Sequence, residues 1–205
     1  LCAVTTSVDD PLARTLVSCG KPIDNTQVKA VDSNGNTLAD RQVGELMVKS
    51  DCMLTEYYKR EDLNPFDTEG WYKTGDRGYL VEGEVFVIGR SKDLIINAGK
   101  NVYPQDLESI INGVSGVHPG RAVVFGVHDD KEGTELIAVV AEVDTHDDAE
   151  RKSIFQDIKQ TVATQTTVTI NYVHLVGDKW LIKTSSGKIA RAANRDKWLK
   201  ETGRS

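Results

Sequence analysis

Short apolar runs separated by turn residues occupy the first ninety positions of the chain. An Asn-Gly dipeptide at residues 34–35 lies between two of these runs, and this dipeptide favours a hairpin turn. Glu-Gly at residues 82–83 separates two further runs, which predicts a second hairpin over residues 78–88. Residues 59–70 are polar and typical of a surface loop. The pattern therefore predicts a β-rich segment, with strands among residues 15–19, 27–31 and 45–48.

The pattern changes after residue 90, where helical and strand periods alternate. Leu107, Ile110 and Ile111 recur at helical spacing, Pro104 suits the first turn of that helix, and Gly113 suits its end. The order of elements predicts a small α+β domain with helices packed on a short sheet. Its later elements are expected as strands at residues 121–127, 136–143 and 168–176, and as helices at residues 147–162 and 189–200.

Composition and charge narrow the classes of protein that this chain can represent. The 205 residues include 25 Lys and Arg against 31 Asp and Glu, a net charge of −6, which argues against a nucleic-acid binder. Cys2, Cys19 and Cys52 lack metal-ligand spacing and are expected as free thiols in a reducing compartment. No run approaches the roughly 20 apolar residues of a transmembrane segment. We therefore expect a cytoplasmic protein.

The expected domain break falls at residues 90–93, where the pattern changes. It divides the chain into residues 1–90, which are β-rich, and residues 91–205, which are α+β. The chain begins at Leu1 without an initiator Met or a signal segment. We expect it to be a piece of a longer protein.

Two polar, glycine-containing segments lie close to the expected domain break. In the first, the Asp76 carboxylate beside Gly75 can accept two hydrogen bonds from a vicinal diol such as a ribose. A turn with a side-chain cap explains the same residues. In the second, the planar fork of Arg90 matches phosphate or sugar oxygens, and Gly99 lets the backbone approach a ligand closely. A domain linker followed by a helix-entry loop is the alternative there.

A third segment, residues 183–189, presents Lys188 from a glycine-containing turn, which suits a contact with an anion. A flexible loop before the last helix is the alternative. The segment is not a phosphate-binding P-loop, because Ile189 rather than Ser or Thr follows the lysine. The two His-Asp-Asp sequences at residues 128–130 and 146–148 each follow a strand or apolar run and are interpreted as turn or cap residues. No metal site is predicted.

Taken together, the three segments resemble the last three motifs of the adenylate-forming enzymes, which include acyl-CoA synthetases, peptide-synthetase adenylation domains and fatty-acyl-AMP ligases. Order and spacing agree over residues 17–199, and the motifs are YKTGD at 72–76, GRxKD at 89–93 with Gly99, and SGKIAR at 186–191. The resemblance implies a small β-barrel-like subdomain that ends a large domain, followed by a mobile α+β lid. It also implies that the phosphate loop and the acyl pocket lie upstream, so the fragment alone is expected to be inactive.

In this family a carboxylic acid and ATP form an acyl-adenylate, and a thiol then displaces AMP. The resemblance implies that Lys188 is the catalytic residue of the first step and that Asp76 and Arg90 hold the ribose. Mg²⁺ would accompany ATP, with its ligands upstream of this chain. Lys92 is implied as the hinge of the moving lid. The loop implied to line the thiol tunnel contains Gly99, Lys100 and Asn101.

Residues 101–108, NVYPQDLE, are most similar to the fatty-acyl-AMP ligases, which pass the acyl group to the phosphopantetheine of an acyl carrier protein. Typical CoA ligases carry Arg where Asn101 stands. An acyl-CoA synthetase that uses CoA is the first alternative, and a peptide-synthetase module is another. A non-catalytic module that binds an acidic carrier protein is an alternative of a different class. Its basic patch would draw on Arg121, Lys152, Lys159, Lys183, Arg191 and Arg195.

Overall fold

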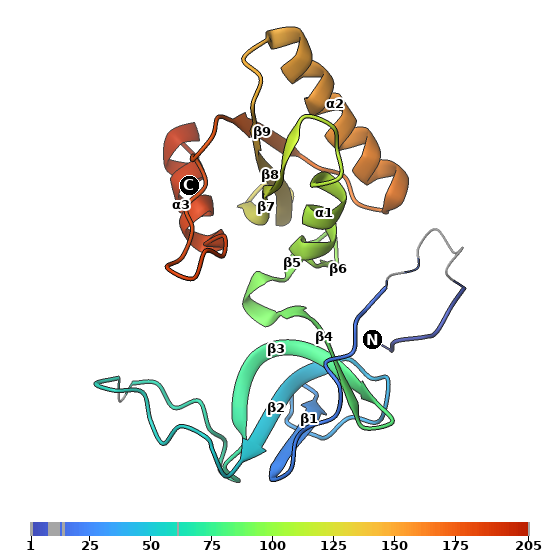
Figure 1. The fold of residues 1–205 in the computed structure, drawn as a ribbon, viewed down its shortest axis with the longest axis vertical. Coiled ribbons are helices and arrows are strands. Elements are labelled where there is room, and N and C mark those ends of the chain that lie inside the picture. Colours follow the sequence, from blue (N-terminus) through green and yellow to red (C-terminus); the bar gives the residue numbers. More distant parts are fainter. Residues whose placement is uncertain (1, 8–12, 14, 61, 205) are drawn as a thin grey trace. The chain divides into compact units, whose positions relative to one another are not determined.

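The computed structural model describes residues 2–7, 13, 15–60 and 62–204 of the chain (Figure 1). Contacts within the chain divide it into two units, Leu1–Lys92 and Asp93–Ser205, and each is described by itself. No helix in the described part has both the length and the apolar character needed to cross a membrane. The fold is mixed α+β, as predicted.

The Leu1–Lys92 unit is built on one antiparallel sheet whose strands follow one another in chain order. The predicted strands at residues 27–31 and 45–48 and the predicted hairpin at 78–88 are confirmed. The strand expected at residues 15–19 is wrong, because this segment only makes single backbone contacts, such as that from Cys19 N to Val85 O. The strands are β1 (Thr26–Val31), β2 (Gly44–Ser50), β3 (Tyr72–Val81) and β4 (Glu84–Arg90).

This sheet is open, so the expected barrel-like form is wrong for the residues that the structure describes. β1 and β4 are its two edges, and they do not pair with each other. The pairing shifts between Glu45 and Met47 on β2 and between Arg77 and Gly78 on β3. Such bulges bend strands and increase their twist. Figure 1 shows the resulting curvature of β3 around β2.

The two turns predicted in this unit have different roles. Glu82 (φ 51°) and Gly83 (φ 81°) both adopt left-handed backbone conformations, which suits the tight two-residue turn between β3 and β4. The Asn-Gly turn at residues 34–35 lies inside a longer connection from β1 to β2. There Asp32 Oδ1 accepts hydrogen bonds from the backbone N–H groups of Asn34 and Asn36, so the turn is stabilised by a side chain at its own start.

The Asp93–Ser205 unit contains a small hairpin, a three-stranded sheet and three helices in the described residues. A 3₁₀ turn, Ser91–Asp93, leads into it. β7 and β8 are antiparallel, whereas β8 and β9 are parallel and are connected through α2. The elements are β5 (Ile95–Asn97), β6 (Lys100–Val102), α1 (Pro104–Ile111), β7 (Val117–Asp129), β8 (Thr134–Val143), α2 (Asp148–Gln165), β9 (Tyr172–Val176) and α3 (Arg191–Thr202).

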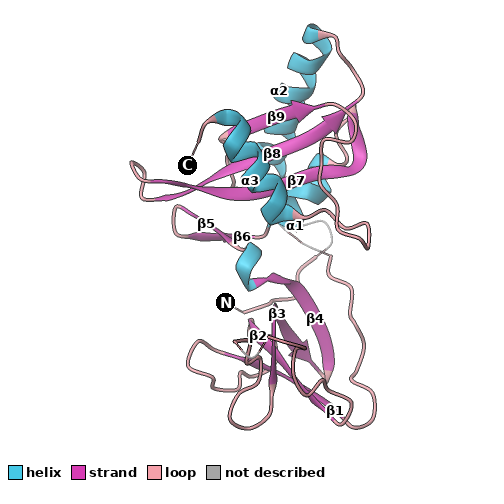
Figure 2. Cartoon of the chain, turned by 90° about the vertical axis from the view of Figure 1, so that its left-hand side faces the viewer, coloured by secondary structure: helices cyan, strands magenta, loops and turns pink. Residues whose placement is uncertain are grey.

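Helices cover both faces of the β7–β8–β9 sheet (Figures 1 and 2). Along β8, side chains alternate between the two faces because the period of a strand is two residues. Ile137 and Val139 belong to the cluster formed with α1 and α2, whereas Ala138 and Val140 belong to the cluster formed with Trp198 of α3. β8 is therefore the central element of this unit.

Local signals explain where the helices begin and which face they bury. Pro104 occupies the first turn of α1, and Leu107 and Ile111 are buried. Asp147 caps α2 by accepting a hydrogen bond from the backbone N–H of Glu150 at 2.8 Å. The three predicted helices and the strands at 121–127 and 136–143 are confirmed, with β7 longer than expected and β9 shorter.

Candidate active site

Asp76 and Arg90 lie opposite each other on paired strands. They are partners in the β3–β4 register, and Arg90 Nε donates to Asp76 Oδ1 at 3.0 Å. The side chains are 30% and 55% exposed, so solvent screens the pair and its contribution to stability is about 0.2–1 kcal/mol. The structure thus brings these two predicted residues together at an accessible position.

A bulge in β3 presents the Asp76 carboxylate. On β2, Met47 pairs with Lys73 and Glu45 pairs with Arg77, so three residues of β3 stand against one residue of β2. The Thr74 hydroxyl donates to the Leu46 carbonyl at 2.7 Å and accepts from Asp76 N at 3.0 Å. The predicted turn with a side-chain cap is therefore present, within a strand, and it holds Asp76 for its contact with Arg90.

Tyr72 begins the same strand and contacts Tyr57 through their hydroxyl groups at 2.8 Å. This hydrogen bond is the main cause that raises the pKa of Tyr72 above 10.0, and desolvation and the Asp76 charge act in the same direction. Tyr72 is therefore a neutral neighbour of the Asp76–Arg90 pair at physiological pH. Sequence reasoning did not single out Tyr57, because it lies fifteen residues away in an irregular segment.

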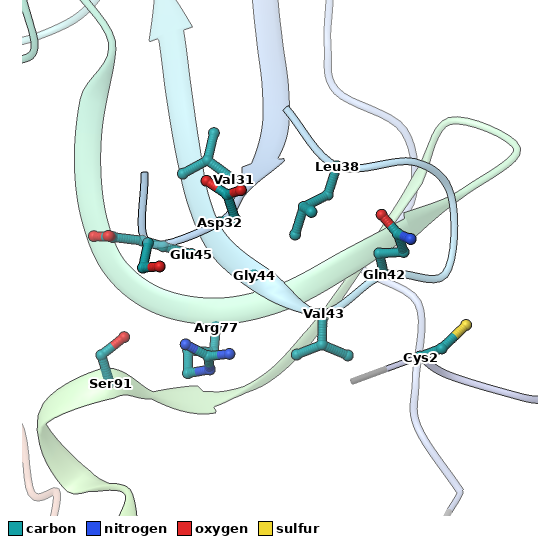
Figure 3. Close-up of a pocket in the computed structure, with 11 residues that line it drawn as sticks. Cys2, Val31, Asp32, Leu38, Gln42, Val43, Gly44, Glu45, Arg77 and Ser91 are labelled. Atoms are coloured by element: carbon teal, nitrogen blue, oxygen red, sulfur yellow. The ribbon is translucent and has the colours of Figure 1, made fainter. Parts of the chain in front are cut away.

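A pocket of about 640 Å³ lies nearby in the same unit (Figure 3). Arg77 and Ser91, which directly follow Asp76 and Arg90 in sequence, contribute to its lining, whereas Asp76 and Arg90 do not. Arg77 Nε is buried without a hydrogen-bond partner in the described residues. The pocket is therefore separate from the Asp76–Arg90 pair, and sequence reasoning gave no signal for it.

Lys188 lies on an ordered hairpin rather than on a flexible loop. Lys183 and Ile189 form a bridge, Thr184 N donates to Lys188 O at 2.7 Å, and Gly187 N donates to Thr184 O at 2.9 Å. The Lys188 side chain is exposed, and its ammonium group forms no ion pair with the residues that the structure describes. Lys188 therefore stands as an accessible, unpaired cation on a fixed backbone.

Two buried polar side chains hold the base of this hairpin, and sequence reasoning missed both. Asn194, which is 0% exposed, accepts from Ile182 N at 2.8 Å and donates to the carbonyls of Ile182 and Ala190 at 2.9 Å each. Glu142, which is 1% exposed, accepts from Leu181 N at 2.8 Å. A single acid within an otherwise apolar run was the available signal for Glu142.

Gly99 lies at the tip of the β5–β6 hairpin, where Asn97 pairs with Lys100. Ala98 (φ 48°) and Gly99 (φ 75°) form the two-residue turn, and glycine accommodates this left-handed conformation without strain. Gly99, Lys100 and Asn101 are exposed. The segment expected as a loop is therefore a short hairpin.

Lys92 is exposed within the 3₁₀ turn Ser91–Asp93. The next residue, Asp93, accepts a hydrogen bond from Arg191 Nη1. Arg191 also donates from Nε to Val124 O at 3.0 Å and from Nη2 to both carboxylate oxygens of Glu108. The residue that follows the predicted hinge is therefore fixed to the segment that carries Lys188.

This network changes the interpretation of the basic patch expected for a carrier protein. Arg191 is only 19% exposed in its side chain and already holds two carboxylates. Arg121 is paired with buried Glu142 at 3.3 Å. Both are therefore poorly suited to a surface patch. Of the other four candidates, Arg195 has a weak, exposed contact with Asp196, and none is paired with a buried or half-buried carboxylate in the described residues.

The His-Asp-Asp sequences act as turn and cap residues, as predicted. Asp129 Oδ1 accepts from the backbone N–H of Lys131 and of Glu132 at 3.0 Å, and Asp147 caps α2. Within the described residues, no group of three or more His, Cys, Asp or Glu side chains is arranged to hold a metal ion. No metal ligand is assigned in this chain.

Comparisons with known proteins find sequences and structures that are similar to this chain. Residues 1–58 match the family model described as AMP-binding enzyme. A long-chain-fatty-acid–CoA ligase of Mycobacterium tuberculosis is 37% identical over 128 residues, which cover 61% of this chain and 25% of that protein. The chain spans about a third of the length of the first curated relatives that it matches.

Two solved structures resemble nearly the whole chain. A structure from a study of fatty acyl-adenylate ligases of E. coli and L. pneumophila has a TM-score of 0.83 and 28% identity, covering 98% of this chain and 36% of that one. A structure of McyG A-PCP complexed with phenylalanyl-adenylate has a TM-score of 0.81 and 31% identity, covering 92% of this chain and 34% of that one. The chain belongs to the adenylate-forming enzymes and corresponds to a C-terminal portion of them.

Proposed function

We propose that this chain is part of an ATP-dependent ligase that activates a fatty acid as an acyl-adenylate and passes the acyl group to the phosphopantetheine of an acyl carrier protein. Lys188 carries the proposal. It combines an exposed, unpaired ammonium group with a backbone that Asn194 and Glu142 hold in place. A cation fixed in this way suits a reaction in which two anions meet, because its charge needs no reorganisation during the reaction.

In the first half-reaction, a carboxylate oxygen of the fatty acid attacks the α-phosphorus of ATP. The new O–P bond forms as the bond to the bridging oxygen breaks, and pyrophosphate leaves. The Lys188 ammonium is proposed to offset the negative charge that accumulates where the carboxylate and the α-phosphate approach. Mg²⁺ would supply further charge neutralisation on the phosphates, from ligands outside this chain.

Asp76 and Arg90 are proposed to hold the ribose of ATP. Arg90 Nε donates a hydrogen bond to Asp76 Oδ1, which fixes the orientation of the carboxylate. Asp76 Oδ2 is left available to accept a hydrogen bond from a ribose hydroxyl. The other N–H groups of the Arg90 guanidinium remain able to donate to a sugar or phosphate oxygen. A carboxylate oriented in this way fits a vicinal diol.

In the second half-reaction, a thiolate attacks the acyl carbon and AMP leaves with its oxygen. The β5–β6 hairpin with Gly99, Lys100 and Asn101 is proposed to line the path of the thiol. Lys92 is proposed as the hinge between the two steps, since a 3₁₀ turn of three residues between two units can absorb a large backbone change.

An acyl-CoA synthetase is the second candidate, and the identity to a long-chain-fatty-acid–CoA ligase favours it. The absence of Arg at position 101 favours the carrier protein instead. The deciding experiment gives the full-length protein ATP, Mg²⁺ and a series of fatty acids, and compares CoA with a phosphopantetheinylated carrier protein as acceptor. Acyl transfer to the carrier protein but not to CoA supports the proposal, and the reverse supports the synthetase.

A non-catalytic module would give a different result in the same experiment. It would release no pyrophosphate with any fatty acid, yet it would bind the carrier protein with an affinity that falls as salt rises. The exposed candidates for such a surface are Lys152, Lys183 and Arg195.

A further inference from the structure

Opposite faces of β8 hold the two hairpins that carry the candidate active-site residues of the Asp93–Ser205 unit. Glu135 and Glu142 are seven residues apart on this strand, and an odd separation places their side chains on opposite faces. The Glu135 side chain lies on the face of α1 and α2, beside Ile95. Glu142 lies on the face of α3, where Leu181 is buried.

Glu135, on the first face, and Thr134, the residue before it at the start of β8, fix the hairpin that carries Gly99. Glu135 Oε2 accepts from Ile96 N at 2.6 Å, and Glu135 O accepts from the Asn97 side-chain amide at 2.7 Å. The Thr134 hydroxyl accepts from Ala98 N at 2.8 Å and donates to Ile96 O at 3.0 Å. Four hydrogen bonds therefore hold the strand and the turn that precede Gly99.

Gly126 on β7 leaves the space that Glu135 occupies. A Cβ at position 126 would lie 2.5 Å from Glu135 Oε1 and 2.9 Å from its carboxyl carbon. Any side chain at this position would force the Glu135 carboxylate to shift from its present place. The close approach of Glu135 to the hairpin therefore depends on a glycine in the neighbouring strand.

On the second face, Asn194 and Glu142 fix the hairpin that carries Lys188. Asn194 contacts Ile182 and Ala190, which lie on the two sides of the hairpin base. Because both groups are buried, removal of either one leaves a backbone N–H without its partner. The two hairpins thus have separate anchors on the two faces of β8, and Arg191 is a further link, because it joins Asp93 before the first hairpin to the helix after the second.

We propose that the two hairpins are positioned independently on the two faces of β8, with Glu135 of β8 as a positioning residue for the thiol-transfer step and Asn194 of α3 as a positioning residue for the adenylation step. This inference rests on the proposed function, in which Lys188 serves the first step and the Gly99 hairpin the second. A displacement of about 1 Å can cost on the order of 100-fold in rate, so loss of one anchor is expected to affect one step selectively.

The test uses single variants of the full-length ligase and measures the two half-reactions separately. Glu135→Ala is expected to lower acyl transfer from preformed adenylate about 10- to 100-fold and to leave adenylation within about twofold. Asn194→Ala is expected to give the opposite result. Glu135→Gln retains an acceptor for Ile96 N and is expected to recover part of the transfer rate. Gly126→Ala is expected to reproduce the effect of Glu135→Ala.

Glu132→Ala and Lys200→Ala serve as matched controls, because both side chains are exposed and lie near the two anchors in sequence. They are expected to leave both half-reactions unchanged. If Glu135→Ala and Asn194→Ala lower both half-reactions equally, or if neither variant changes either rate, independent positioning is wrong.

A second readout separates this inference from the proposed function. Hydrogen exchange of peptides from the full-length protein should become faster over residues 95–102 in Glu135→Ala only, and faster over residues 182–190 in Asn194→Ala only. This exchange pattern supports independent anchoring whatever the role of Lys188. If Lys188→Ala leaves adenylation intact, that result refutes only the role of Lys188. Faster exchange over both segments in each variant would overturn independent anchoring.

Discussion

Arg191 Nη2 donates two hydrogen bonds to the carboxylate of Glu108, at 2.9 and 3.0 Å, and thereby joins the first turn of α3 to α1. The same guanidinium holds Asp93 and the carbonyl of Val124. Three nitrogens of one planar guanidinium thus contact three different residues, and the single ammonium nitrogen of a lysine could not reproduce this arrangement. The network therefore connects the segment after the predicted hinge with the start of the helix that follows Lys188.

Replacing Arg191 is expected to destabilise the Asp93–Ser205 unit strongly. Arg191→Ala leaves two partly buried carboxylates without their cation, and loss of one partner of such a pair costs about 3–5 kcal/mol. Urea unfolding of the chain followed by circular dichroism measures this change. The matched control is Arg195→Ala, whose exposed side chain has only a weak contact with Asp196 and is expected to change stability by less than about 0.5 kcal/mol. Equal effects of the two variants would contradict the role assigned to Arg191.

Asp76→Asn in the full-length protein is expected to raise the KM for ATP with little change in stability. The variant weakens the contact with Arg90 and removes the charged acceptor proposed for the ribose. Steady-state kinetics with varied ATP concentration measures this effect. Asp62→Asn is the control, because Asp62 also pairs with an arginine, Arg60, on an exposed loop. The proposal fails if the KM for ATP is unchanged in Asp76→Asn or rises equally in both variants.

Lys92→Pro is expected to separate the two half-reactions. Proline fixes φ near −65° and pushes Ser91 toward extended geometry, so the hinge would sample fewer conformations. We expect adenylation to survive and acyl transfer to fall, since the proposed lid would reorient only after adenylation. Lys92→Ala, which leaves the backbone free, is expected to retain both steps. A normal unfolding midpoint with equal loss of both steps would exclude Lys92 as the hinge, and unchanged activity would place the hinge elsewhere, with Asp93 next.

His174 is expected to make the stability of its unit depend on pH. Desolvation is the largest cause that lowers the pKa of His174 from 6.5; Arg151 adds to this, whereas Glu201 opposes it. As pH falls below 6.5, the unfolded chain gains a proton that folded His174 still resists, so stability decreases until pH passes the lowered pKa. Unfolding midpoints measured between pH 7.5 and pH 5 test this, with His174→Gln expected to reduce the slope. An identical slope in the variant would assign the dependence to other groups.

The elements that the sequence predicts well are those that depend on local signals. Pro104 and Asp147 identify the starts of two helices in the sequence. The Glu-Gly pair at residues 82–83 identifies a tight turn, in which both residues adopt left-handed backbone conformations. The strand expected at residues 168–176 is shorter in the structure. Asn171 exchanges hydrogen bonds with Ile137 through its side chain and its backbone, which extends the contact without a regular ladder.

The features that the sequence does not predict depend on contacts between distant segments. The openness of the first sheet depends on which strands pair, and the β3 bulge depends on Leu46 accepting from Thr74. The motifs around Asp76 and Lys188 are visible in sequence, but the residues that hold them are not. Asn194 looks like an ordinary polar residue of a helix until its contacts with Ile182 are known.

Lys188 is proposed to provide the positive charge for adenylate formation. The most direct measurement compares the two half-reactions of the full-length protein with those of Lys188→Ala, with Lys183→Ala on the same hairpin as control. We expect pyrophosphate release to fall on the order of 10²–10³-fold in Lys188→Ala, because a positioned electrostatic contact is lost, while acyl transfer from preformed adenylate is largely retained. Equal loss of both half-reactions, or adenylation at the rate of the unmodified protein, would contradict it.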